Sequence, residues 1–318
     1  MAFHTPGGGE MQLMAYKRHL PDKDVSVTLF DPWKPDFNSY DIFHFFSCIG
    51  GSIHLCNFVK QLGIPLVITS SLWITHKNKM NYNLDEIRWQ LSLADAVITN
   101  SEMESDTLAD VLDLPRERFK AVYNGVENFF YDDIVPGDEF RNEFKIDSHF
   151  VLNVANVEPR KNQLGLIRAM KQFPDKKLVI MGYIRDKAYA EQVFAEGKDQ
   201  VIYTGPVDNG SRTLRSAYSA CDVFCLPSTL ETPGLAALEA YACGSRVVVT
   251  SVGSTREYFD DRVTYADPDS ADDIASAINI ELNKEQKTAA RKNFRWGEVV
   301  KPLRDIYLET VTKAGSKK

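Results

Sequence analysis

Short apolar runs alternate with amphipathic stretches along most of this chain, and that alternation limits the folds open to it. In the first half, the runs have the length and composition of buried parallel strands. Helical patterns lie between them, for example over residues 10–20 and 52–63. The order of strand and helix predicts a doubly wound α/β domain. Its expected strands are residues 25–30, 40–46, 65–70, 94–101 and 120–126.

The same alternation starts again after residue 148. Residues 127–148 have no clean period and are rich in Asp and Phe, which predicts an interdomain linker. We therefore expect an N-terminal domain over residues 1–140, a second Rossmann-like domain over 149–295 and an amphipathic helix over 296–318. The strands expected in the second domain are residues 150–157, 176–183, 199–207, 221–228 and 245–251.

Composition narrows the class of protein. The chain has 318 residues, 44% hydrophobic and 25% charged, which suits a globular protein of two domains. Its net charge of −7 argues against nucleic acid as a partner. No apolar run reaches the roughly 18 residues of a membrane span, and the first ten residues do not resemble a secretory signal. We expect a cytoplasmic protein, and peripheral contact with the inner face of a membrane stays open.

The cysteines and acidic residues do not predict a metal site. The chain has five cysteines, an odd number, without the paired spacing of zinc ligands. We expect no cofactor and no metal, and small buried thiols in a reducing compartment.

One segment, PSTLETPGLAALEAYACG over residues 227–244, indicates chemistry most directly. A buried strand leads into it, a helix starts near Pro233-Gly234, and another strand follows. Ligands of open α/β sheets bind beyond the carboxyl ends of the strands. Glu231 lies before the helix start, and Glu239 lies about 8 Å along the helix.

Carboxylates accept two hydrogen bonds from vicinal diols, and the free N–H groups of a helix start suit a phosphate. Together these features fit a nucleotide sugar, with the hexose at Glu231, the pyrophosphate at the helix start and the ribose at Glu239. Glutamates in such places are also often merely solvated. Spacing alone leaves both interpretations open.

The segment resembles the E-x7-E signature of family 4 retaining glycosyltransferases, which have the GT-B fold. The matching residues include Glu231, Gly234, Leu235 and Glu239, while Thr232-Pro233 replaces the usual Gly-Phe. The resemblance implies two Rossmann-like domains facing across a cleft, with the C-terminal helix crossing back to the first. It also implies that Thr232, Pro233, Gly234 and Leu235 border the donor.

A second motif, VANVEPRKN over residues 154–162, follows a strand and precedes a helix. Arg160 and Lys161 at a helix start make an anion site. The segment resembles the family's phosphate-binding motif, in which Lys161 matches the phosphate-binding lysine. Asn156 stands where the family usually has arginine, so Arg160 is expected to supply the second charge.

Several glycines follow expected strands. Gly8 and Gly9 follow a very short expected first strand over residues 3–5 and resemble the family's first-loop glycines beside the donor phosphate. Gly182 and Gly205 end two strands of the second domain, where family members hold base and ribose. Ordinary turn glycines explain the latter pair equally well.

The acceptor side is expected in the first domain, around His44, Ser71 and Trp73. His44 ends an apolar strand, where a histidine is more often a hydrogen-bonded core residue than a catalyst. Ser71 stands where the family often carries histidine.

By resemblance, the chain is expected to move a hexose from a UDP- or GDP-type sugar to a saccharide or lipid-linked acceptor, with retention and without metal. Lys161 and Arg160 would stabilise the leaving phosphate, and Glu231 would hold the sugar. A non-catalytic nucleotide-sugar-binding subunit and a GT-B epimerase, for which Asp41 and His44 are the acid/base candidates, remain as alternatives.

Overall fold

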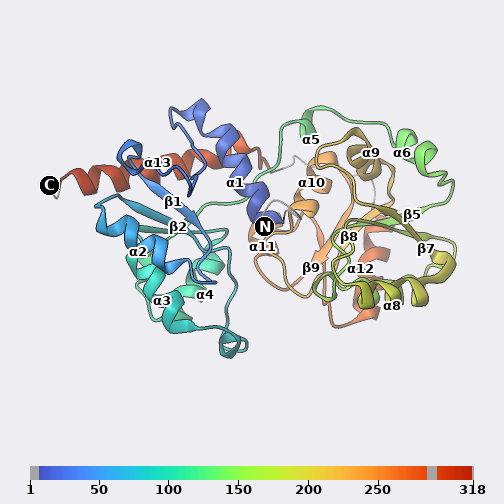
Figure 1. The fold of residues 1–318 in the computed structure, drawn as a ribbon. Helices are drawn as coiled ribbons and strands as arrows, with labels where there is room; N and C mark the ends of the chain where they lie inside the picture. Colours follow the sequence, from blue (N-terminus) through green and yellow to red (C-terminus); the bar gives the residue numbers. More distant parts are fainter. Residues whose placement is uncertain (1–6, 285–291, 317–318) are drawn as a thin grey trace. The chain divides into compact units, whose positions relative to one another are not determined.

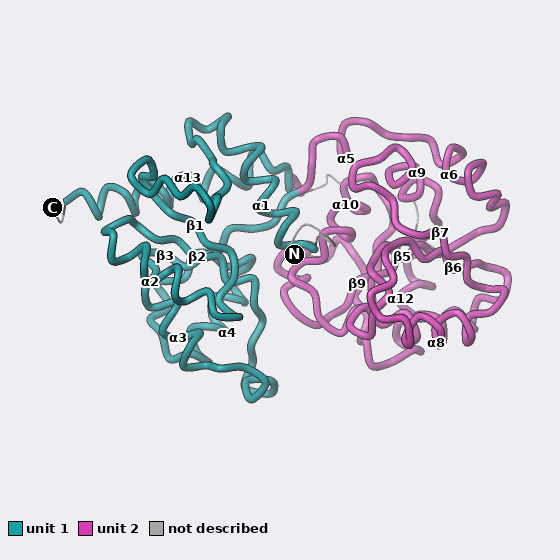
Figure 2. The backbone as a smooth tube through the Cα atoms, viewed as in Figure 1, with its two compact units in different colours: residues 1–125, 294–318 teal, residues 126–293 magenta. Residues whose placement is uncertain are grey.

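The computed structural model describes residues 7–284 and 292–316 and divides the chain into two units (Figure 2). Unit 1 comprises residues 1–125 and 294–318, and unit 2 comprises residues 126–293. The expected first strand over residues 3–5 lies outside the described residues.

Unit 1 contains, within its described residues, a four-stranded parallel sheet of order β1-β2-β3-β4. Its first two strands are labelled in Figure 1. Helices α2, α3 and α4 connect successive strands. The strands are β1 (Phe43–Phe46), β2 (Leu66–Thr69), β3 (Ala96–Thr99) and β4 (Phe119–Ala121). The helices are α1 (Gly8–His19), α2 (Ile53–Gln61), α3 (Leu84–Leu93), α4 (Glu102–Leu112) and α13 (Trp296–Gly315).

Alternate side chains of the central strands pack on opposite faces of this sheet. Leu66 and Ile68 join a core cluster with α2, α3 and α4, whereas Val67 joins a second cluster with α1 and α13. Trp296, Val300, Leu303 and Tyr307 are the buried contacts of α13 in that second cluster. The helix at the C-terminal end therefore packs on the first sheet, as expected.

The strand expected over residues 25–30 is wrong. This segment is not part of any sheet among the described residues. Its Val25 and Val27 pack against the cluster of α1 and α13, while Ser26 and Thr28, which alternate with them, are exposed. Apolar alternation fits an extended segment that covers a core on one side as well as it fits a strand.

Unit 2 contains, in the part that the structure describes, a six-stranded parallel sheet of order β10-β9-β8-β5-β6-β7. Its strands are β5 (Phe150–Val154), β6 (Lys177–Met181), β7 (Val201–Gly205), β8 (Val223–Leu226), β9 (Val247–Thr250) and β10 (Thr264–Ala266). Its helices are α5 (Phe129–Asp132), α6 (Gly137–Phe144), α7 (Gln163–Met170), α8 (Lys187–Gly197), α9 (Arg212–Ala220), α10 (Leu235–Cys243), α11 (Thr255–Phe259) and α12 (Ala271–Asn283).

Both faces of this sheet are covered. Helices α7, α8 and α12 share one core cluster with residues of β5, β6 and β8. On the other face, Phe140 of α6 lies 5.8 Å from Phe150 of β5 between ring centroids, and Tyr218 of α9 lies 5.8 Å from Phe224 of β8. The two halves of the chain therefore form the α/β architecture expected from the sequence.

Residues 127–148 do not form the expected linker. They contain α5 and α6, which belong to unit 2. Phe130 and Phe140 are both buried, and the hydroxyl of Ser216 on α9 accepts a hydrogen bond from the Phe140 N–H at 2.8 Å. Helices this short show too little apolar periodicity to be recognised, and their stability comes from tertiary packing. Among the described residues, no helix is both long and apolar enough to cross a membrane.

Candidate active site

The strand order of unit 2 reverses between β5 and β8, which are neighbours in the sheet although β6 and β7 separate them in sequence. Such a switch point leaves a crevice between the two loops that leave the carboxyl ends of the strands. The β5–β8 ladder pairs Val151 with Val223 and Leu152 with Phe224. One residue further on, the Asn153 side chain donates to the Cys225 carbonyl at 2.8 Å. The loops beyond this point, residues 155–162 and 227–234, carry both motifs singled out in the sequence.

Lys161 and Glu231 meet directly across the switch point. The Lys161 Nζ donates to Glu231 Oε1 at 2.5 Å, and Arg160 Nη1 lies 3.9 Å from the same oxygen. The Lys161 and Glu231 side chains are 13% and 7% exposed, so their ion pair is mostly shielded from water. The site thus brings together three residues that the sequence assigned to catalysis. The direct pairing itself was not expected.

The two cations hold Glu231 in its charged form. Burial alone raises the pKa of this carboxyl, but the charges of Lys161 and then Arg160 lower the pKa by more. The net pKa lies below its ordinary value. Glu231 is therefore an anion at neutral pH and can accept hydrogen bonds from hydroxyl groups.

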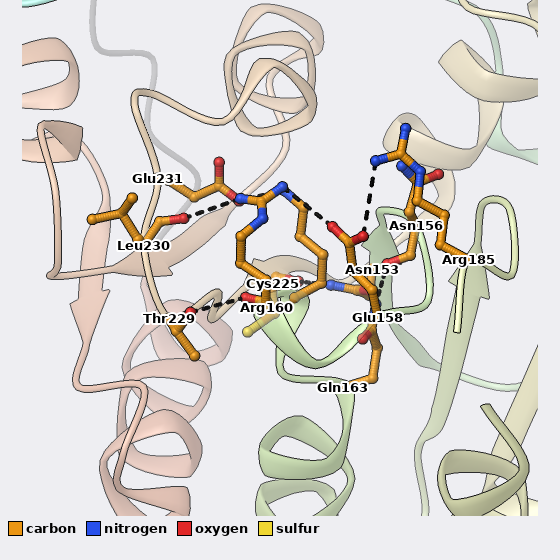
Figure 3. A network of polar contacts seen from close by, with 11 residues as sticks. Asn153, Asn156, Glu158, Arg160, Gln163, Arg185, Cys225, Thr229, Leu230 and Glu231 are labelled. Carbon is orange, nitrogen blue, oxygen red and sulfur yellow. Dashed lines mark hydrogen bonds and ion pairs between the residues drawn. The ribbon is translucent and has the colours of Figure 1, made fainter. Parts of the chain in front are cut away.

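Further charges extend this pair into a row (Figure 3). Arg160 Nη2 lies 3.3 Å from Glu158 Oε1, and Arg185 Nη1 lies 3.8 Å from Glu158 Oε2. The row alternates in sign and contains one more cation than carboxylates. Glu158 and Arg185 were not singled out in the sequence, although Glu158 belongs to the EPRKN motif.

Asn162 fixes the backbone that carries Lys161. It adopts a left-handed conformation with φ of 56°, and its Oδ1 accepts the Gly165 N–H at 3.3 Å as the N-cap of α7. Its Nδ2 donates to the carbonyls of Pro227 at 3.0 Å and Pro268 at 2.8 Å. One side chain therefore ties the loop after β5 to the loops after β8 and β10. Arg160 and Lys161 lie in a 3₁₀ turn (Pro159–Lys161) just before α7.

The backbone at Glu231 is held by the turn after β9. The Ser254 N–H donates to the Glu231 carbonyl at 3.1 Å, and the Glu231 N–H donates to the Val252 carbonyl at 3.2 Å. Between them, Gly253 has a φ of +100°, and a Cβ there would lie 2.1 Å from the Glu231 carbonyl oxygen. A close approach of this kind requires glycine.

The helix after the acidic loop begins later than its proline. Thr232 is half-buried, Pro233 is buried, and Gly234 with a φ of +86° precedes the first residue of α10, Leu235. A Cβ on Gly234 would lie 3.4 Å from the carboxyl carbon of Glu231. The four residues predicted to border the donor therefore form the turn between Glu231 and the start of α10.

Glu239, the second carboxylate of the motif, has its own partners. The Tyr218 hydroxyl donates to its Oε2 at 2.9 Å, and the Asn209 Nδ2 donates to its Oε1 at 2.7 Å. Burial raises the pKa of Glu239 to about 7, and these two hydrogen bonds limit the rise. Neither Tyr218 nor Asn209 was predicted, because one lies within a helix and the other lies in a DNG sequence typical of a turn.

The remaining candidates of unit 2 are backbone features. A Cβ on Gly182 would lie 2.1 Å from the Ala155 carbonyl oxygen, so close packing between two strand ends explains that glycine. The Gly182 N–H donates to the Gly205 carbonyl at 3.1 Å. Gly205 has a φ of +78°, with open space where a Cβ would be. The Asn156 carbonyl accepts from Gln163 Nε2 at 2.9 Å.

His44 does not end its strand as expected: it is the second residue of β1 and pairs with Val67 of β2. Both ring nitrogens of His44 are within hydrogen-bonding distance of a hydroxyl, Nδ1 of Tyr307 at 2.5 Å and Nε2 of Thr69 at 2.7 Å. Burial lowers the pKa of His44 to about 3, so the ring is neutral at physiological pH. These contacts favour the core role. Ser71 is exposed just after β2, and Trp73 is half-buried.

Gly8 and Gly9 begin α1 and are both exposed. The Gly7 N–H before them donates to the Glu10 side chain at 2.8 Å, which caps the helix. Across residues 7–284 and 292–316, no group of three His, Cys, Asp or Glu side chains is arranged to hold a metal ion.

Comparisons with known proteins agree with the two-part fold. Residues 137–295 match the family model described as glycosyl transferases group 1, and residues 34–128 match the one described as glycosyltransferase family 4. The first match contains the Lys161–Glu231 pair and Glu239.

Two curated relatives illustrate the similarity. An uncharacterised glycosyltransferase of Methanocaldococcus jannaschii is 29% identical over 236 residues, covering 66% of this chain and 59% of that protein. The D-inositol 3-phosphate glycosyltransferase of Mycolicibacterium smegmatis is 30% identical over 233 residues, covering 67% and 52%. The matched region thus spans little more than half the length of these relatives.

Two solved structures share the fold. Anabaena HepE, solved in complex with UDP-glucose, superposes with a TM-score of 0.73 at 19% identity, covering 98% of this chain and 97% of that one. Sucrose-phosphate synthase from Thermosynechococcus elongatus gives 0.72 at 22% identity, covering 86% and 74%. With both family models matched in order and the E-x7-E residues in place, the chain belongs to the group 1, family 4-like glycosyltransferases with the GT-B fold.

Proposed function

We propose that this chain is a glycosyltransferase that moves a hexose from a nucleoside diphosphate sugar to a hydroxyl of a saccharide or lipid-linked acceptor. The observation that carries the proposal is the buried Lys161–Glu231 pair, with Arg160 beside it, at the switch point of unit 2. A cation and an ionised carboxylate side by side suit a ligand that presents a phosphate next to hydroxyl groups. A sugar diphosphate has this arrangement.

The roles follow from the charges and positions. Lys161 and Arg160 would bind the diphosphate, with the free N–H groups at the start of α10. Glu231, held ionised by these cations, would accept hydrogen bonds from hexose hydroxyls. Glu239, further along α10, would accept hydrogen bonds from the ribose. Relatives named glycosyltransferases, and a structural neighbour solved with UDP-glucose, support a nucleotide-sugar donor.

We further propose that the reaction retains the anomeric configuration and needs no metal. The bond between the anomeric carbon and the phosphate oxygen would break, and the acceptor oxygen would bond to the same face of that carbon. The released phosphate oxygen would take the proton of the acceptor hydroxyl. Lys161 and Arg160 would stabilise the negative charge that develops on the phosphate, a role that preorganised cations perform well in a site shielded from water.

Incubation of the purified chain with UDP-, GDP-, ADP- and dTDP-hexoses and a panel of acceptors tests the proposal. The expected result is transfer that persists in EDTA and gives a product of unchanged anomeric configuration by NMR. An isomerised donor would indicate an epimerase instead. Donor binding without any turnover would favour a non-catalytic subunit. Sedimentation with anionic vesicles tests for the peripheral contact with the inner face of a membrane that the sequence left open.

A further inference from the structure

Two serines just beyond strands β1 and β2 have an unusual backbone conformation. Ser47 directly follows β1 with a φ of +115°, and Ser71 lies two residues past the end of β2 with a φ of +45°. Among the described residues, every other non-glycine residue with a positive φ stands at the end of a helix. Strain of this kind persists only where surrounding contacts hold it, and it is frequent at ligand sites.

Glu104 on α4 holds the chain on both sides of Ser71. Its Oε1 accepts hydrogen bonds from the Ser70 hydroxyl at 2.7 Å and from the Leu72 N–H at 3.3 Å. Its Oε2 accepts the Asn100 N–H at 2.8 Å, from the loop after β3. One carboxylate therefore joins the loops after β2 and β3 and fixes the residues immediately before and after Ser71.

The burial of Glu104 is costly. The residue is 1% exposed, and burial raises the pKa of its carboxyl, while hydrogen bonds from Ser70 and Asn100 oppose the rise. Within residues 7–284 and 292–316, no cationic side chain forms an ion pair with it. An apolar side chain could fill this space without the cost of burying a charge. The arrangement of Glu104 therefore suits a role in fixing geometry more than a role in stability.

Ser71 itself is open to a ligand. It is exposed, and its hydroxyl, N–H and carbonyl form no hydrogen bond to any residue that the structure describes. It lies at the carboxyl edge of a parallel sheet, where ligands of such sheets bind. An exposed hydroxyl and an exposed N–H that are fixed in position can both form hydrogen bonds with the hydroxyl groups of a sugar.

The loop after β1 is held in a similar way. Gln90 on α3 is fully buried, its Nε2 donates to the Ser47 carbonyl at 3.0 Å, and its Oε1 accepts the Ser52 hydroxyl at 2.8 Å. Gly50 and Gly51, between these two serines, have open space where a Cβ would be. Two neighbouring strands thus end in loops that a buried polar side chain holds in a strained conformation. This repetition indicates that the edge of the sheet is shaped for a ligand.

We propose that Glu104 is a positioning residue for the acceptor, which holds Ser71 in its left-handed conformation so that Ser71 can bind an acceptor hydroxyl. This inference rests on the proposed function, because it assumes that a sugar acceptor binds to unit 1. Glu104 acts through Ser71 and does not touch the acceptor.

Transfer assays that vary each substrate in turn test the role of Glu104. The donors are UDP-, GDP-, ADP- and dTDP-hexoses, and the acceptors are methyl glucoside, methyl galactoside, methyl mannoside and octyl glucoside. We expect the acceptor KM to rise about threefold in Glu104→Gln, which keeps one acceptor oxygen, and about tenfold in Glu104→Ala, which loses all three hydrogen bonds. The donor KM should change by less than about twofold in both variants, because the donor is proposed to bind to unit 2.

Two further variants separate positioning from stability. Glycine adopts a positive φ without strain, so Glu104→Ala/Ser71→Gly should recover part of the unfolding temperature that Glu104→Ala loses. Its acceptor KM should stay at least as high as that of Glu104→Ala. Glu102→Ala is the matched control, since Glu102 lies two residues earlier on α4 and pairs with Arg116 at the surface. Its acceptor KM should equal that of the wild type.

The outcomes separate the two proposals. An unchanged acceptor KM in Glu104→Ala, an equal rise in its donor KM, or full recovery of the acceptor KM in the double variant would overturn the positioning role and leave the proposed function standing. If Glu104→Ala does not fold, Glu104→Gln decides by the same comparison of the two KM values. A wild type that transfers a hexose to none of the four acceptors would overturn the proposed function and the positioning role with it.

Discussion

Lys161 Nζ and Glu231 Oε1 lie 2.5 Å apart across the point where the strand order of unit 2 reverses. The groups proposed to bind phosphate and hexose thus neutralise each other in the absence of ligand. A donor that supplies both an anion and hydroxyl groups can replace each partner with one of its own. The pair would therefore favour a ligand that presents both an anion and hydroxyl groups over one that presents either alone.

Lys161→Met is expected to lower kcat by about 10²- to 10³-fold, since it removes a cation from the developing phosphate charge. It should also lower the free energy of unfolding by about 3 kcal/mol, because the buried Glu231 carboxylate would keep only the more distant Arg160 guanidinium, 3.9 Å away. Transfer assays and urea unfolding measure the two effects. Lys171→Met serves as the control, since Lys171 pairs with Glu196 at the surface.

The double variant Lys161→Met/Glu231→Gln separates the structural effect from the chemical one. It should regain most of the lost stability, because no buried charge is left unpaired, but none of the lost turnover. A Lys161→Met variant with wild-type turnover would contradict the assignment of Lys161 to the leaving phosphate.

Glu239 predicts a pH-dependent stability. Its pKa is about 7 in the folded chain against a reference value of 4.5, so folding favours the protonated form. That stabilisation is fully present below pH 4.5 and is lost as the pH rises through 7. The total is about 3 kcal/mol for a shift of this size. The wild type should therefore lose stability relative to Glu239→Gln between pH 5 and 8, as measured by urea unfolding at each pH. A difference that stays constant over this range would contradict the prediction.

Asn162 offers a test of how the site is positioned. Asn162→Asp keeps an acceptor for the Gly165 N–H but loses the donor to the Pro227 and Pro268 carbonyls. We expect it to raise the donor KM about tenfold, because the Lys161 and Glu231 loops lose their shared tie. Asn162→Gly tolerates the left-handed backbone but loses all three bonds, and should be worse in both KM and thermal stability. Equal behaviour of Asn162→Asp and the wild type would remove the positioning role.

Gly253→Ala should destabilise unit 2 by about 3 kcal/mol or more, since its Cβ would collide with backbone and the left-handed region is strained for alanine. Urea unfolding measures the loss. Gly297→Ala is the matched control, because a Cβ there meets nothing within 4 Å inside α13. It should leave stability unchanged or raise it by up to about 1 kcal/mol.

The buried strands were predictable from the sequence because both faces of each sheet are covered. Strands such as β2, β3, β8 and β9 are buried at every residue and read as continuous apolar runs. The prediction of a strand over residues 25–30 was wrong, because the apolar alternation there reflects packing on one side and not hydrogen bonding to a neighbouring strand. Helices α5 and α6 were missed because packing within unit 2, and not local periodicity, stabilises them.

The candidate site was predictable in its residues but not in its contacts. The motifs identified Lys161, Arg160, Glu231 and Glu239 by residue type and spacing. The pairing of Lys161 with Glu231 depends on β5 lying beside β8. Neither of the two motifs contains information about the order of the strands in the sheet. Asn209 lies in a turn and Tyr218 lies within a helix. Nothing in the sequence distinguishes these hydrogen-bond partners of Glu239 from ordinary turn and helix residues.

One face of the first sheet is covered by α13, which follows unit 2 in the sequence. Residues 1–125 leave the ribosome before residues 126–293, and both segments leave it before Trp296, Val300 and Leu303, which pack on the face that contains Val67 and Ile98. Until α13 has been synthesised, that face of the first sheet lacks the side chains that cover it. All residues of unit 2 have been synthesised by then. During synthesis, the unit that emerges first is therefore the one that finishes folding last.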